Sequence, residues 1–138
     1  MSYATQADLE TRFGSEELAQ RTDRINGSVI DATVVARALA DADAEIDAYL
    51  AVRYQLPLAS VPAWLGRVAC DISRYRLCDV PPEEVRTRYE DAVRDLKRAA
   101  DGSLVVDGAS ALAKSPSGIG VASRAPDRVF GADVLSGY

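Results

Sequence analysis

Four carboxylates on one predicted helix are the side chains of this chain best suited by type and spacing to chemistry. Asp41 and Glu45 lie four residues apart, and so do Asp43 and Asp47. Such pairs could serve acid–base catalysis or bind a divalent cation. At about 100° per residue, however, the two pairs fall on opposite flanks of the helix's apolar stripe. Because they point apart, we expect a solvated or intersubunit acidic rim, and we predict no catalytic or metal site.

The chain has no histidine, which excludes several kinds of catalytic and metal site. A Ser-His-Asp triad, a Cys-His nucleophile pair and a zinc site with mixed ligands all need that side chain. Cys70 and Cys78 should lie about 12 Å apart along one predicted helix, whereas a disulfide needs Cα atoms within roughly 7 Å. We therefore expect two unpaired, small hydrophobic cysteines.

Two loops superficially resemble ligand-binding motifs. With Gly27 at the sixth position of a calcium loop, Arg24 would stand at the third, where a ligand oxygen belongs. Residues 23–28 are therefore interpreted as a plain turn around Asn26-Gly27. Gly118-Ile119-Gly120 begins like a phosphate loop, but no strong strand precedes it and no helix follows it. We predict neither site.

Apolar residues at three- and four-residue steps predict an all-α fold. Two short helices are expected first, from Thr5 or Gln6 to Arg12 and from Ser15 onward. Three long helices should follow: from residue 31 to about 54, from residues 60–62 to the break at 79–82, and from 83 to 101. Val61 is assigned to the apolar seam of the second long helix. The matching stripes predict a small antiparallel bundle over residues 1–102.

Residues 103–138 read as an extended C-terminal arm, which could contain a short strand or hairpin at 104–108. Six of the chain's nine glycines lie from residue 102 onward, and no helical periodicity is present there. An extended segment cannot bury apolar side chains against itself, so it needs another surface. The alternative is a disordered tail whose aromatic residues are incidental. We predict that these arm residues bind a partner or an adjacent subunit: Arg124, Arg128, Val129, Phe130, Val134, Leu135 and Tyr138.

Composition places the chain among ordinary globular domains. Its 138 residues fit one domain, with 48% hydrophobic and 27% charged side chains. A net charge of −5 argues against general binding to nucleic acid, which needs local Lys and Arg. No signal-peptide run and no membrane-spanning stretch is visible. We therefore expect a protein that is made and used in a cytoplasm, or in a particle assembled there.

Several segments occur in an order that resembles a known family. They are residues 2–5 (SYAT), 8–9 (DL), 12–14 (RFG), 41–50 (DADAEIDAYL), 53–58 (RYQLPL), 69–77 (ACDISRYRL) and 85–92 (VRTRYEDA). This ordered set resembles the small Mu-like bacteriophage and prophage proteins assigned to head–tail joining. The resemblance covers residues 1 to about 100, and residues 128–130 (RVF) more loosely. The turn at 23–28 departs from the pattern, because relatives tend to be more acidic and glycine-rich there.

The resemblance implies a structural virion protein with no active site and no cofactor. It implies a head–tail connector adaptor that forms a ring, usually of twelve copies, beneath the portal of a filled capsid. The implied partners are other copies of the chain, the portal protein, and the next connector (stopper) or tail-terminator protein. Double-stranded DNA would pass through the ring without specific binding, and no membrane is involved. The protein would be assembled in the host bacterial cytoplasm.

A closed ring needs a heterologous interface, in which different faces of neighbouring copies meet. The predicted intersubunit charges are Asp41, Asp43, Glu45 and Asp47 on one side, and Arg74, Arg88 and Arg94 on the other. The alternative for these residues is a simple solvated surface, since exposed ion pairs are worth only ~0–1 kcal/mol each.

The rival function is a cytoplasmic helical regulator, such as an antitoxin-like or transcription-associated binding module. A basic recognition helix would be expected for it, whereas the arginines here alternate with acids.

Overall fold

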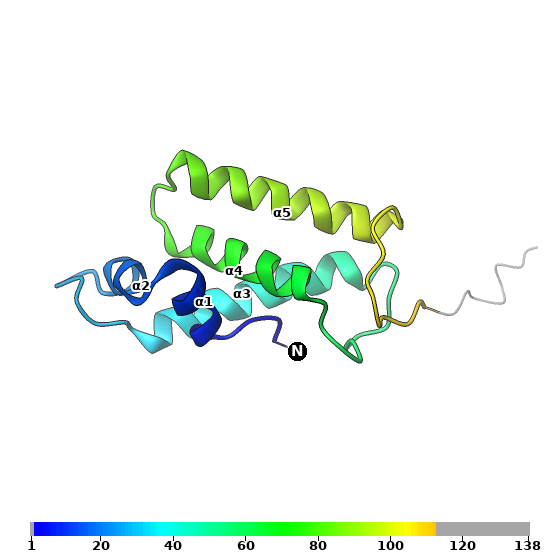
Figure 1. Cartoon of the computed structure of the whole chain (residues 1–138), viewed down its shortest axis with the longest axis horizontal. Coiled ribbons are helices and arrows are strands. Elements are labelled where there is room, and N and C mark those ends of the chain that lie inside the picture. Colours follow the sequence, from blue (N-terminus) through cyan, green and yellow to red (C-terminus); the bar gives the residue numbers. More distant parts are fainter. Residues whose placement is uncertain (1, 113–138) are drawn as a thin grey trace, which may run out of the picture.

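The computed structural model describes residues 2–112, and in that range the protein is all-α. Its elements are α1 (Gln6–Phe13), α2 (Ser15–Thr22), α3 (Ala32–Leu50), α4 (Ala63–Leu77) and α5 (Glu83–Asp101). Helices α3, α4 and α5 run antiparallel to their neighbours in sequence (Figure 1). The short helices α1 and α2 lie beside the end of the bundle where α3 begins and α4 ends (Figure 1). The predicted fold class is confirmed.

The first N-terminal helix, α1, begins with the Thr5 cap that the sequence predicts. The Thr5 hydroxyl accepts the backbone N–H of Asp8, and the Asp8 carboxylate accepts the backbone N–H of Thr5. This reciprocal pair satisfies two N–H groups that an uncapped helix leaves without a partner. Gly14, at φ +89°, then ends α1 and leads directly into α2, a conformation that favours glycine.

Helix α3 is shorter than predicted, because it ends at Leu50 and not near Tyr54. Its start is as expected, since the Asp31 carboxylate accepts the N–H groups of Thr33 and Val34. At the other end, Tyr54 forms an isolated antiparallel bridge with Ala111. The backbone there pairs with a segment that returns from beyond α5, and this pairing replaces a further helical turn.

The bundle core consists of one apolar stripe from each long helix. Small side chains on α3 let the other helices approach closely, and branched side chains fill the space between them. The fully buried set includes Val35, Ala42, Ile46 and Leu50 of α3, Leu65, Val68 and Ile72 of α4, and Val85, Ala92 and Leu96 of α5. Val61 was wrongly assigned to this core: it precedes α4, which begins at Ala63, and it is exposed.

Residues 103–112 fold back onto the helices after Gly102 ends α5 in the left-handed conformation. Val106 is only 2% exposed and belongs to the core, whereas Val105 is 68% exposed. The predicted turn at Asp107-Gly108 is present, with the Ala109 N–H bonded to the Val106 carbonyl. The strand considered for 104–106 is not formed. The first part of the predicted arm therefore packs on the body.

The remaining arm residues, including all seven predicted binding residues from Arg124 to Tyr138, lie outside the described residues. Over the range that the structure describes, none of the helices is long and apolar enough to span a bilayer.

Replacing Val106 by Ala should lower the free energy of unfolding by about 2 kcal/mol, because two buried methyl groups are lost and a cavity remains. The matched change Val105→Ala should alter it by less than about 0.5 kcal/mol. Urea unfolding followed by circular dichroism measures both. Equal effects of the two changes would contradict the packing of this segment on the body.

Candidate interaction surfaces

The acidic flank formed by Asp43 and Asp47 binds the chain's own N-terminal segment. The Tyr3 backbone N–H donates to Asp43 at 3.0 Å, and the Tyr3 hydroxyl donates to Asp47. Tyr3 itself is 5% exposed and part of the core. Burial, followed by the bond to Asp47, raises the pKa of the Tyr3 hydroxyl, and burial also raises the pKa of Asp43. These two carboxylates therefore hold the residues before α1 against α3.

On the other flank of α3, Glu45 connects all three long helices. Its carboxylate accepts a bond from the Arg76 guanidinium of α4 and another, at 3.0 Å, from the Tyr89 hydroxyl of α5. The Tyr89 ring stacks on Tyr75 with centroids 4.0 Å apart. Burial and the neighbouring Glu45 carboxylate raise the pKa of Tyr89 to about 12. Glu45 is thus an internal linker between α3, α4 and α5.

Two of the predicted intersubunit arginines are also bonded within the chain. Arg74 donates two bonds to Glu17 of α2, at 2.7 and 3.0 Å, and its guanidinium lies over the Phe13 ring. Although burial opposes it, bonding to Arg74 brings the pKa of Glu17 below its usual value. Arg94 pairs with Asp91, one turn earlier on α5, at 3.0 Å.

Five of the seven predicted intersubunit charges are therefore engaged inside one molecule. The Asp41 and Arg88 side chains differ, because neither makes a hydrogen bond or an ion pair in the range 2–112, although the Asp41 charge acts on Arg76 and the Arg88 charge on Asp71. Both side chains are exposed. The intersubunit role of all seven residues stays a prediction. The structure shows that five of them already have partners in the same chain, whereas Asp41 and Arg88 form no ion pair in the described range.

The turn at residues 23–28 is present and is held by a single carboxylate. Asp23 accepts the backbone N–H groups of Ile25 and Asn26 at 3.1 Å, and those of Ser28 and Val29 at 3.3 and 3.4 Å. These bonds lower the pKa of Asp23, with Asn26 contributing most. Both oxygens of the Asp23 carboxylate therefore accept bonds from the loop's own backbone, and these bonds shape the turn.

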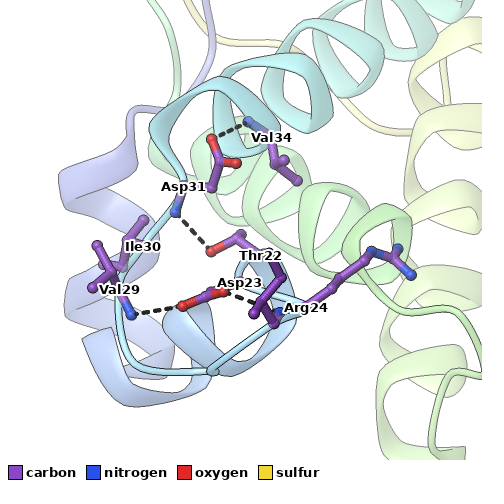
Figure 2. Close-up of a pocket in the computed structure, with 8 residues that line it drawn as sticks. Thr22, Asp23, Arg24, Val29, Ile30, Asp31 and Val34 are labelled. Carbon is purple, nitrogen blue, oxygen red and sulfur yellow. Dashed lines mark hydrogen bonds between the residues drawn. The ribbon is translucent and has the colours of Figure 1, made fainter.

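A second anchor ties this turn to the connection between α4 and α5. The Arg24 guanidinium makes a two-pronged ion pair with Asp79, at 2.6 and 2.7 Å. The Thr22 hydroxyl accepts the Asp31 N–H and so closes the base of the loop (Figure 2). Arg24 extends from the turn toward the neighbouring connection (Figure 2). The two loops therefore form one supported surface at this end of the bundle.

This supported surface exposes large apolar side chains that the sequence pattern did not predict as a site. Ile25 is 90% exposed, Val29 68% and Val80 87%. Ile25 and Val80 follow Arg24 and Asp79 directly in the chain, so they flank the ion pair. The sequence signal for this surface is the presence of large apolar residues within polar turns. Apolar periodicity does not reveal them, because a turn has no repeating pattern.

The opposite end of the bundle also exposes apolar side chains. Val52 follows α3, Val105 follows α5, and Leu112 is the last described residue; they are 71%, 68% and 45% exposed. Figure 1 shows that these segments lie at the end away from α2 and the 23–31 loop. The body thus carries exposed apolar residues at both ends.

Comparison with known proteins identifies the family to which this arrangement belongs. Residues 3–123 match the family model described as Bacteriophage Mu, Gp36. The chain belongs to this family. It is 40% identical over 121 residues to "Gene product J" of Escherichia phage Mu, covering 86% of this chain and 85% of the relative. It is 38% identical over 103 residues to "Mu-like prophage FluMu protein gp36" of Haemophilus influenzae, covering 74% and 73% respectively.

The predicted resemblance to Mu-like phage and prophage proteins is confirmed. Membership of the Gp36 family supports a structural or assembly role in a phage, and suggests a protein without enzymatic activity. The match runs past the helical body into the predicted arm as far as residue 123.

Replacing Asp23 by Ala should loosen the 23–29 loop, because four backbone N–H groups lose their acceptor. Amide hydrogen exchange should accelerate by roughly tenfold or more at residues 25, 26, 28 and 29. Glu16→Ala, at an exposed acid of α2, serves as the control. Since the pKa of Asp23 is lowered in the folded protein, its contribution is present above the ordinary Asp pKa of about 3.9 and is lost as the pH falls through the lower folded value. Unchanged exchange in Asp23→Ala would contradict this account.

The raised pKa of Tyr89 predicts a loss of stability at alkaline pH. A phenol whose folded pKa lies near 12 stabilises the fold fully below pH 10, and that contribution disappears as the pH rises toward 12. The thermal midpoint of Tyr89→Phe should therefore fall less steeply between pH 10 and 12 than that of the unmodified chain. Tyr54→Phe is the control, and parallel pH profiles for all three proteins would refute the prediction.

Proposed function

We propose that this protein is a head–tail connector adaptor, a structural virion protein that forms a ring beneath the portal. It joins the DNA-filled capsid to the tail or to the next connector protein. The observation that carries this proposal is a Gp36-family body with exposed apolar residues at two opposite ends. An adaptor must bind one protein above and another below, so it needs two separate docking ends on a body that keeps its shape.

The end formed by residues 22–34 and the α4–α5 connection is suited to rigid docking. Its loop is held by the Asp23 carboxylate and by the Arg24–Asp79 ion pair. Because the backbone is already ordered, binding through Ile25, Val29 and Val80 loses little conformational entropy. We assign this end to one of the two neighbours, the portal protein or the next connector.

The opposite end is the one from which the arm continues. Its last described residue, Leu112, is followed by a stretch that carries the predicted anchors Val129, Phe130, Val134, Leu135 and Tyr138. Apolar anchors on an extended segment are typical of peptides that bind in a groove or along a sheet edge. We propose that residues 121–138 bind the portal or an adjacent copy in this way.

The charge of the chain is consistent with a DNA channel. A net charge of −5 repels the phosphate backbone, so a duplex would slide past without being held. The bonding of the arginines argues against the rival regulatory function. Arg74, Arg76 and Arg94 are engaged by acids of the same chain, so they do not form the free basic patch that a DNA-reading module needs.

Deleting residues 122–138 in a Mu-like phage that carries this gene should abolish head–tail joining while leaving the helical body folded. Plaque titre should fall by several orders of magnitude, and electron microscopy of lysates should show filled heads separated from tails. Circular dichroism of the purified truncated chain should retain the helical signal. A second variant, with Val129, Phe130, Val134 and Leu135 replaced by Ser, should reproduce the defect at full length.

The unmodified protein should be detected in purified virions by immunoblot. Normal titres from the truncated phage would contradict the role of the arm, and absence of the protein from virions would contradict the adaptor function itself.

A further inference from the structure

An open hollow on one side of the bundle is lined by residues of all three long helices. Asp41, Ala44, Glu45 and Tyr49 come from α3, Arg76 from α4, and Tyr89 from α5. Its volume is about 620 Å³. Ala44 has the smallest side chain of this lining. We call this the Asp41 hollow.

The chemistry of the Asp41 hollow suits a guanidinium group. Glu45 already holds one, that of Arg76, next to the Tyr89 hydroxyl. Asp41 stands at the rim with an exposed carboxylate and with no hydrogen bond or ion pair to a residue in the described range. Carboxylates bind arginine through charged, often two-pronged hydrogen bonds. The Asp41 charge acts on Arg76 across the hollow, but the two side chains form no ion pair. The Asp41 carboxylate oxygens therefore remain open to a second guanidinium.

One arginine of the chain is available to fill such a site in another copy. Arg88 is exposed and makes no ion pair with a residue between 2 and 112. The other basic side chains without an ion pair are less suitable. Arg37 and Lys97 line hollows that share residues with the Asp41 hollow. Arg12 lies beside the buried Cys70, and Arg53 lies against Gly102 at the end of the bundle.

Arg88 and the Asp41 hollow are on different sides of the molecule. The charge of Arg88 acts on Asp71 of α4, whereas the hollow contains Arg76 of the same helix. Asp71 and Arg76 are five residues apart in α4, which corresponds to a rotation of about 140° around the helix axis. Tyr89, next to Arg88 in α5, points to the hollow and bonds Glu45, so Arg88 is turned away from it by about 100°. Arg88 cannot reach the hollow of its own chain.

We propose that the Asp41 hollow of one copy receives the Arg88 side chain of a second copy. The contact joins two different faces, so it repeats head to tail and produces a closed ring or, if the rotation does not close, a helical filament. The inference deepens the proposed adaptor function and rests on it for the expectation of a ring. The pairing of Asp41 with Arg88 is a property of the purified chain and is tested separately.

The test exchanges the charges of Asp41 and Arg88 in the full-length chain. Self-association is measured by sedimentation velocity at protein concentrations up to about 1 mM. The unmodified protein should self-associate. Asp41→Arg and Arg88→Asp should each weaken association by roughly tenfold or more, because attraction becomes repulsion across the contact. The double variant Asp41→Arg with Arg88→Asp should recover association to within about threefold of the unmodified chain. Glu16→Arg, an equal change of charge on α2, should have no effect.

Three results would overturn the proposal. The first is an unmodified chain that stays monomeric over the whole range. The second is a double variant no better than the single ones. The third is association that is lost on deleting residues 122–138 but is insensitive to Asp41→Arg, which would identify the arm as the occupant. Filaments in place of rings, or absence of the protein from virions, would count against the adaptor function while leaving the Asp41–Arg88 contact supported.

Discussion

The structure depends on helix α3 having both of its acidic flanks bound by other parts of the same chain. Its apolar stripe lies in the core, and its carboxylates lie at the edges of that stripe. Asp43 and Asp47 hold Tyr3, which brings the N-terminal segment onto the bundle. Glu45 holds Arg76 and Tyr89, which joins α4 and α5 to α3. Partly buried carboxylates need such partners, because a desolvated charge without one is costly. Apolar packing and charged hydrogen bonds therefore both hold the N-terminal segment, α4 and α5 against α3.

This internal pairing determines which surfaces remain for assembly. Charges that stabilise the fold are not free to bind a neighbour without a cost to the fold. Of the seven charges predicted for an interface, Asp41 and Arg88 form no ion pair within residues 2–112, and they lie on different sides. Apolar residues also remain exposed at the two ends. Under the proposed adaptor function, the two charges would serve contacts between copies, and the apolar ends would serve contacts with the two neighbouring proteins.

The elements were predictable where local signals are strong. The Thr5 and Asp31 caps, the Gly14 and Gly102 breaks and the apolar stripes placed all five helices, because capping and periodicity are short-range effects. Predictions were wrong where a distant segment intervened. Helix α3 stops at Leu50 because residues 53–55 pair with residues 110–112, some sixty positions away in the chain. Val106 became a core residue for the same reason, although nothing in its immediate sequence distinguishes it from Val105.

The sequence alone determined the helical class, the order of the helices, the absence of histidine chemistry and the resemblance to Mu-like phage proteins. These follow from residue types and short spacings. Only the tertiary structure decided which charges are available. In the sequence, Asp41, Asp43, Glu45 and Asp47 are equivalent members of one acidic run. In the fold, three of them meet Tyr3, Arg76 or Tyr89, and Asp41 meets none of these groups through a hydrogen bond or ion pair. The partner of a surface charge is set by how helices pack, and packing is a long-range property that spacing along the chain does not encode.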